Sequence, residues 1–343
     1  MKKQVFLMVA FIATVFLTAC NNEIAVESME KGQEISFRLQ GGMPDVSSRA
    51  LATTIANLEA FVVYGTDDVL AATNDLIFDG ATVAREFDSS PASFTYAPKK
   101  YFSEGAIHAG FLAFSPVSAS ISNPDLTALL TGASFDYTVP EPDDSQEDLL
   151  VAMQTVIPAP GMPPVSLEFS HALARIFVTA TNDMDDPVII ESLTLSNLYS
   201  EGKMEIDYDF YATPQLSSKW TNHANMIDYE YILAETGVAV PAQTTTQRLV
   251  TSMEQGMMVL PQETQNTNDD DVQDAGDFAL VVEYSIGNLT SQTAYILLED
   301  KFEFEANKQY TINISFSGAT LILIDFTVTV KDFEAPIEVD YPI

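Results

Sequence analysis

The sequence is poor in the residues from which most catalytic and metal sites are built. Its 343 residues contain one cysteine and three histidines, His108, His171 and His223. A single cysteine excludes an internal disulfide, and no two histidines lie at the spacing of zinc ligands. The nucleophile-elbow, metalloprotease and phosphate-loop motifs are also absent. The sequence therefore predicts no enzyme, no metal and no cofactor.

Basic residues are scarce as well. Fifteen Lys and Arg stand against 49 Asp and Glu, which gives a net charge of −34. Such a surface repels phosphate backbones, so we expect no nucleic-acid partner. A large net charge of one sign also favours solubility outside the cell.

Long hydrophobic runs are missing except at the N-terminus. Lys2 and Lys3 precede a continuous apolar stretch, Val5–Leu17, and small residues lead to Cys20. This pattern resembles a bacterial lipobox and predicts a signal peptide over 1–20, with a lipid on Cys20 that holds the protein at the outer membrane. The alternative is a general signal peptide with an incidental cysteine. No later run reaches the ~18 residues that span a bilayer.

The rest of the chain is rich in short apolar segments separated by Gly, Pro, Asn and Asp. Helical periodicity is limited to one turn expected at 125–130, and a Pro-rich run at 158–164 is the candidate domain boundary. Hydrophobic residues make up 47% of the chain, as in a globular protein. The pattern predicts an all-β protein of two tandem β-sandwich domains, 50–164 and 165–343. Its expected strands are 58–64, 94–96, 111–114, 135–139, 165–169, 171–180, 188–198, 257–260, 278–286, 293–298, 310–316 and 321–330.

The segment that follows the signal peptide, 21–49, is a polar tether and a first strand. Ile35, Phe37 and Leu39 alternate with polar residues, and glycines and a proline then break the strand. Arg49–Ala50 ends an exposed, small-residue loop of the kind that a trypsin-like protease cuts. The segment is either an ordinary first strand with its loop or a strand that cleavage after Arg49 removes.

Three further features carry alternatives. The acidic loop 266–276 is either a cation site or a solvated loop. The loop lacks the glycine and the terminal glutamate of an EF-hand, so its sequence favours a solvated loop. Trp220, Tyr229 and Tyr231 form a glycan-stacking platform or pack within strands, and packing is the commoner role. No pair among the many carboxylates stands out as a glycosidase pair.

Several short segments form an ordered set of motifs along the chain. They are Tyr101–Phe102, Phe111–Pro116, Asp148–Ala152, Phe169–Ile176, Met258–Gln262, and Lys308–Ile314 with Phe326–Val330 and Asp332–Phe333. Phe169–Ile176 matches the pattern F-x-H-x-L-A-[KR]-[ILV], and Met258–Gln262 matches [ILMV]-L-P-Q. Together the segments resemble the motifs of the fimbrillin family, the type V pilins of Bacteroidales. Phe333 stands where the family usually has tryptophan.

The resemblance implies two tandem transthyretin-like β-sandwiches in a lipoprotein that becomes part of a cell-surface fimbrium. It implies cleavage after Arg49 by an arginine-specific protease, release of the first strand, and polymerisation with other copies or other fimbrial subunits by strand exchange. The implied role is adhesion, with a host or glycan receptor as a further partner. The alternatives are an accessory tip or anchor subunit, or a monomeric glycan-binding or hydrolytic surface lipoprotein.

The C-terminus offers a donor strand for this exchange. Past Pro336, Ile337, Val339, Tyr341 and Ile343 alternate with polar residues or proline. Four apolar side chains at a period of two match the period of the first strand. The alternative is that 337–343 forms a closing edge strand in its own chain.

Overall fold

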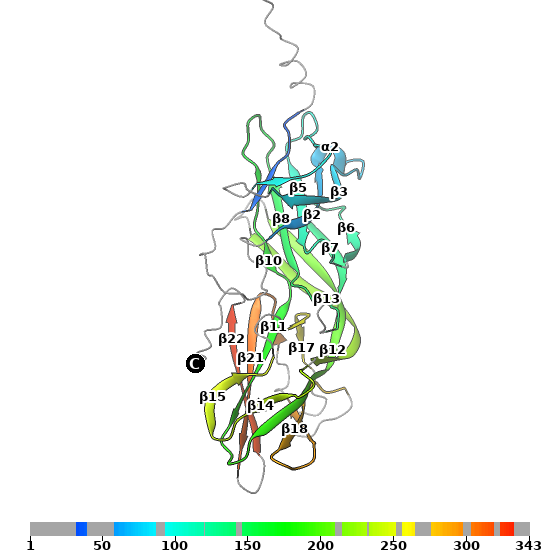
Figure 1. The fold of residues 1–343 in the computed structure, drawn as a ribbon. Coiled ribbons are helices and arrows are strands. Elements are labelled where there is room, and N and C mark those ends of the chain that lie inside the picture. Colours follow the sequence, from blue (N-terminus) through cyan, green and yellow to red (C-terminus); the bar gives the residue numbers. More distant parts are fainter. Residues whose placement is uncertain are drawn as a thin grey trace, which may run out of the picture.

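The computed structural model describes residues 32–39, 58–86, 93–119, 121–141, 146–209, 215–231, 233–251, 256–264, 276–297, 303–318 and 323–332. These residues form β-strands and one short helix, α2 (Asp68–Ala71). The molecule is elongated, with α2 at one end and strand β18 (Ala279–Ile286) at the other (Figure 1). The prediction of an all-β fold is confirmed.

A six-stranded antiparallel sheet forms the end that carries α2. Its central strand β5 (Ala109–Ser115) is buried along its whole length, because both faces of the sheet are covered. One face contributes to a hydrophobic cluster with Phe61 and Phe111, and the other to a larger cluster with Leu112 and Phe114. In order, the sheet contains β10 (Ser170–His171), β8 (Leu150–Val156), β5, β2 (Ala60–Asp67), β3 (Phe78–Arg85) and β4 (Phe94–Thr95).

Two further sheets, of five and seven strands, share the second cluster and extend to the other end. In the five-stranded sheet, β11 (Ala174–Asn182) and β21 (Lys308–Ser317) are parallel neighbours. The remaining strands of that sheet are β15 (Thr244–Leu249), β16 (Met257–Val259) and β22 (Leu323–Asp332). The seven-stranded sheet contains β6 (Ile121–Asp125), β7 (Gly132–Thr138), β12 (Val188–Asp209), β13 (Gln215–Tyr231), β14 (Val238–Val240), β18 and β19 (Gln292–Leu297). β17 (Gln262–Glu263) and β20 (Glu303–Phe304) pair with each other.

Strand β12 connects the two ends of the seven-stranded sheet. Its first residues pair with β18, and residues 201–207 pair with β7, which comes from the first half of the chain. Met204, Ile206 and Tyr208 are buried and alternate with polar residues, the pattern of a strand with one covered face. The division of the chain at 164 stays a prediction, and β12 forms one sheet with strands from both sides of it.

The helical turn expected at 125–130 is wrong. Residues up to Asp125 belong to β6, and tight turns follow, in which Leu129 N–H donates to the Leu126 carbonyl and Thr131 N–H to that of Ala128. Asp125 pairs with Ser134 of β7, so the strand reaches into the expected turn. The Asp125 carboxylate then accepts from the Thr127 amide and hydroxyl, which favours a turn over a helix.

Candidate functional site: the first strand and its groove

The first strand lies between two segments that come much later in the chain. β1 (Phe37–Leu39) pairs in parallel with β9 (Val165–Leu167). On the other side, Glu34 forms an antiparallel bridge with Tyr101. The first strand therefore fills a gap between two edges rather than extending one sheet.

Backbone hydrogen bonds join it to both edges. Val165 N–H donates to the Ser36 carbonyl at 2.7 Å. On the opposite side, Ile35 N–H donates to the Lys100 carbonyl at 3.0 Å, and Phe102 N–H donates to the Gln33 carbonyl at 3.1 Å. If the strand left, the Val165 and Phe102 amides and the Lys100 carbonyl would each need a new partner.

The apolar side chains of this strand are set into an aromatic cage. Ile35 and Phe37 are almost fully buried, Leu39 is half-buried and Arg38 is exposed, as the alternation predicts. The Phe37 ring lies 5.5–6.0 Å from four rings, mostly edge to face; these are Phe61, Phe78, Tyr96 and Phe111. Two buried large side chains contribute about 3–6 kcal/mol before ordering costs. The cage is thus the main apolar anchor of β1.

Side-chain hydrogen bonds and an ion pair also hold the first strand in place. The Tyr96 hydroxyl donates to the Ile35 carbonyl oxygen, and burial raises the pKa of Tyr96. Gly161 N–H donates to the Gln33 side-chain oxygen at 2.9 Å. The Lys99–Glu34 ion pair, 3.1 Å long, is exposed and adds little to stability.

The cage is the part of the site that the sequence patterns do not predict. Its rings come from β2, β3 and β5 and from the residue after β4, so no local pattern assembles them. β9 follows the Pro-rich run, in the part of the chain predicted to form the second domain, yet Val165 and Leu167 pack in the same cluster as Phe37. The sequence signal that could have indicated such a cage is the number of aromatic residues in the first half of the chain.

The predicted sites at the two termini lie outside the described residues. They are the lipidation site Cys20, the processing site Arg49–Ala50 and the candidate donor residues Ile337, Val339, Tyr341 and Ile343. Most of the acidic loop 266–276 also lies outside them. Lipidation, processing and strand donation therefore stay predictions.

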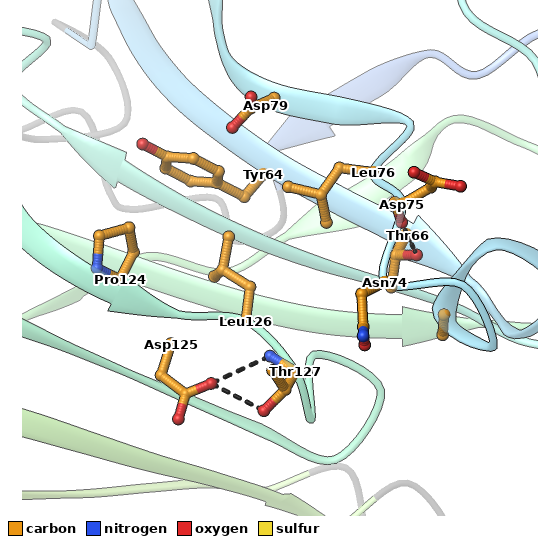
Figure 2. A pocket seen from close by; sticks show the side chains of 11 residues that line it. Tyr64, Thr66, Asn74, Asp75, Leu76, Asp79, Pro124, Asp125, Leu126 and Thr127 are labelled. Carbon is orange, nitrogen blue, oxygen red and sulfur yellow. Dashed lines mark hydrogen bonds between the residues drawn. The ribbon is translucent and has the colours of Figure 1, made fainter.

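A pocket of about 350 Å³ lies between the β2–β3 and β6–β7 connections. It is where a carboxylate pair of the kind used in glycoside hydrolysis can be looked for. Figure 2 shows Asp79 and Asp125 on opposite sides of the Tyr64 and Leu126 side chains. Thr127 donates to the Asp125 carboxylate from its amide and its hydroxyl, and these bonds lower the pKa of Asp125. A general acid needs a raised pKa, so this shift argues against Asp125 as the general acid of a glycosidase pair.

The aromatic residues considered as a glycan platform pack inside the protein. Trp220 Nε1–H donates to the Ala172 carbonyl at 2.9 Å, and its ring contacts those of Phe135 and Tyr137. Tyr229 and Tyr231 are buried. Packing within strands, the commoner role, is what the structure shows.

Within the described ranges, nothing indicates a metal site or a membrane span. No group of three or more His, Cys, Asp or Glu side chains there could hold a metal ion. No helix in those ranges is long and apolar enough to cross a bilayer.

The family-like residues of the second half are core residues. His171 Nδ1 lies 2.7 Å from Asp148 Oδ2, and both side chains are buried. The buried Arg175 guanidinium lies 4.6 Å from the centre of the Phe177 ring. Burial lowers the pKa of Arg175 to about 10, while the charge of Asp148 acts in the opposite direction. Their contacts link the segment before β8 with β10 and β11, and they are those of a packed core.

The sequence and the fold are both similar to those of known fimbrial proteins. A family model described as fimbrillin-like matches residues 48–332. A fimbrial protein from Bacteroides vulgatus is 14% identical, covers 88% of this chain and 99% of its own, and has a TM-score of 0.59. A protein described as a cell adhesion protein from Bacteroides uniformis is 16% identical, covers 80% and 91%, and has a TM-score of 0.47. The tip fimbrial protein Mfa3 from Porphyromonas gingivalis is 8% identical, covers 79% and 93%, and has a TM-score of 0.39. No curated protein matches the sequence. The B. vulgatus protein shares the fold.

Proposed function

The chain belongs to the fimbrillin-like family, and we propose that it is a fimbrial subunit whose first strand is removed and then replaced by a strand of another subunit. The observation that carries the proposal is the position of β1. This strand places Phe37 in a four-ring cage and bonds to two separate edges, at Val165 and at Lys100–Phe102. The family match begins at residue 48, so β1 lies outside it.

The physical argument concerns what removal of β1 would leave. The Phe37 and Ile35 positions would become an apolar slot, and two rows of backbone groups would lose their partners. An open edge next to an apolar slot favours the entry of an extended strand from another chain. Only a strand with apolar side chains at a period of two satisfies both the slot and the edges.

The two termini supply the remaining parts of the proposal. Residues 1–20 act as the signal peptide, lipid on Cys20 holds the precursor at the outer membrane, and 21–49 is the removed segment. An arginine-specific protease cuts after Arg49. Ile337, Val339, Tyr341 and Ile343 then enter the groove of the next subunit. The resulting fimbria serves adhesion to a host or glycan receptor. A tip subunit would need the groove but no donor strand.

Cleavage and assembly of three variants test the proposal. The first is Arg49→Ala, its matched control is Arg38→Ala, and the third lacks 337–343. After treatment with an arginine-specific protease, N-terminal sequencing should find Ala50 first in the wild type and in Arg38→Ala, and both should form SDS-resistant ladders. Arg49→Ala should stay uncut and monomeric, because β1 then keeps the groove filled.

The deletion variant separates a stalk subunit from a tip subunit. It should be cut normally yet remain monomeric, because it has a groove but no donor. Ladders from the uncut Arg49→Ala protein would contradict strand exchange. Ladders from the cut deletion variant would place the donor strand elsewhere.

A further inference from the structure

The pocket between the β2–β3 and β6–β7 connections lies on the face of β2 opposite the aromatic cage. Tyr64 and Thr66 line the pocket. Gly65 between them faces the cage, since a Cβ atom at this position would lie 2.7 Å from the Phe111 ring. Side chains alternate along a strand, so the pocket and the cage lie on opposite faces of one sheet. The pocket is therefore independent of strand exchange.

Apolar side chains form the middle of the pocket. Tyr64, Leu76 and Leu126 are half-buried, pack on the larger hydrophobic cluster and line the pocket. The Tyr64 ring is supported by the ring of Phe114, whose centre lies 6.1 Å away. A volume of about 350 Å³ is at the small end of the range for ligand sites, ~300–1,000 Å³. The pocket therefore suits a single side chain rather than a long segment.

Every charged residue that lines the pocket is acidic. The three are Asp75, Asp79 and Asp125. The Asp75 carboxylate already accepts from the Thr73 hydroxyl at 2.6 Å. Asp79, in contrast, accepts no hydrogen bond and forms no ion pair with any residue that the structure describes. Both Thr127 bonds to Asp125 go to Oδ1, so the second oxygen of this carboxylate can still accept.

The negative charges flank the apolar centre. The Thr127 bonds, and to a lesser extent the charge of Lys203, lower the pKa of Asp125, so this carboxylate is ionised at neutral pH. Burial and then the charge of Asp79 raise the pKa of Tyr64, so Asp79 lies close to this phenol. Figure 2 shows Asp79 beyond the Tyr64 ring on one side and Asp125 beyond Leu126 on the other. Such a site is complementary to a cation on an aliphatic stem.

Other ligand classes suit this arrangement less well. The carboxylates repel an anion. In the ranges that the structure describes, no group of three or more His, Cys, Asp or Glu side chains could hold a metal ion. A neutral sugar would leave both flanking charges without a counter-charge. A basic partner, in contrast, is attracted over a distance by a chain with a net charge of −34.

We propose that this pocket binds the side chain of a lysine or arginine from a basic segment of a partner protein. The cationic group lies between Asp79 and Asp125. Its methylene stem packs on Leu76 and Leu126, and the Tyr64 ring adds a cation–π contact. The pocket thus gives the protein a specific anchor for basic partners, on a surface separate from the groove.

Binding of matched peptides to the uncut protein tests the proposal. The probes are acetyl-Gly-Lys-Gly-amide and the same peptide with norleucine for lysine, which keeps the stem and removes the charge. The pocket variant carries Asp79→Asn and Asp125→Asn together. Its control carries Asp183→Asn and Asp185→Asn, in the turn after β11. Both control residues are exposed, and Asp185 accepts from Gln243 at 3.0 Å much as Asp125 accepts from Thr127. Affinities are measured by ligand-observed NMR titration.

We expect the lysine peptide to bind wild type weakly but saturably. Its affinity should fall about fivefold or more in the pocket variant, because both carboxylates beside the ammonium group are lost. The control variant should bind the peptide as wild type does. The norleucine peptide should bind wild type about fivefold or more weakly than the lysine peptide does. Asp79→Asn alone, compared with Asp183→Asn, replaces the double variant if the latter is less stable to heat than wild type.

Four outcomes overturn the proposal. Equal losses in the pocket and control variants would show general attraction to an acidic surface. Equal affinities for the two peptides would assign the pocket to an apolar ligand. Tighter binding of N-acetylglucosamine than of the lysine peptide, lost only in the pocket variant, would assign it to a sugar. A wild-type protein that does not bind the lysine peptide would leave the pocket without this role. None of these results bears on strand exchange, which the ladder experiments test separately.

Discussion

The hydroxyl of Tyr96 donates a hydrogen bond to the carbonyl oxygen of Ile35, across 61 residues of chain. The same tyrosine ring packs against Phe37 at 6.0 Å and Phe78 at 5.1 Å. One side chain therefore holds the first strand both by its backbone and through the cage. If the strand is removed, Tyr96 loses both its Ile35 acceptor and its contact with Phe37.

Tyr96→Phe should weaken the hold on the first strand and leave the cage intact. We expect a loss of about 1–2 kcal/mol in the free energy of unfolding, because the Ile35 carbonyl loses its side-chain donor. Urea denaturation of the uncut protein measures this. Tyr284→Phe is the control, since the Tyr284 hydroxyl bonds only weakly to Gln292, at 3.3 Å, and lies far from the groove in the sequence and the sheet order. Equal losses in both variants would argue against a special role for Tyr96.

Phe37→Ala should be the most damaging substitution in the first strand. A buried phenylalanine replaced by alanine costs about 3–5 kcal/mol, and here four neighbouring rings lose their contact. Leu39→Ala should cost clearly less because Leu39 is only half-buried. Both are measured by denaturation of the uncut precursor. In cut protein that has lost the strand, neither substitution should matter, and a persisting loss would mean that the strand is still bound.

The ionisation of Tyr96 should report whether the groove is filled. Burial raises the pKa of Tyr96 above its ordinary value of 10.0 in the folded, uncut protein. The neutral phenol is thus favoured by folding, so its contribution to stability is complete below pH 10 and is lost as the pH rises through the folded value. Absorbance titration, with Tyr96→Phe subtracted, should show a pKa closer to 10 after the strand leaves. An unchanged pKa after strand loss would mean that Tyr96 stays buried.

Cys20→Ala should abolish lipid attachment and release the precursor from membranes. The prediction follows from the apolar run and small residues that precede the only cysteine. Radiolabelled palmitate incorporation and membrane fractionation measure it. Continued labelling of the variant would contradict the lipid site, while folding, measured by circular dichroism, should not change.

The family and the all-β fold were both within reach of the sequence. The alternation of Ile35, Phe37 and Leu39 predicts which side chains face the core, and Ile35 and Phe37 are buried accordingly. The family resemblance, drawn from short motifs such as Phe169–Ile176, is confirmed by the match over residues 48–332. Local periodicity suffices for such features because it reflects which face of each strand is covered.

The pairing between strands that are distant in the chain could not be predicted from the sequence. The parallel register of Phe37 with Val165 depends on a contact between residues 128 positions apart, which no local pattern encodes. The full length of β12 is a different case. Met204, Ile206 and Tyr208 alternate with Lys203, Glu205 and Asp207, so the extension beyond Leu198 could have been recognised from its period of two. The helical turn expected at 125–130 was wrong because pairing with Ser134 of β7 holds Asp125 in β6.

The length of β12 has a mechanical consequence. This strand of 22 residues pairs with β18 and β14 near its start and with β7 and β13 farther along. Tension applied along such a strand strains many of its hydrogen bonds at once, whereas a force across it would open them one at a time. A pull along β12 would therefore load β7, from the first half of the chain, together with β18, from the second.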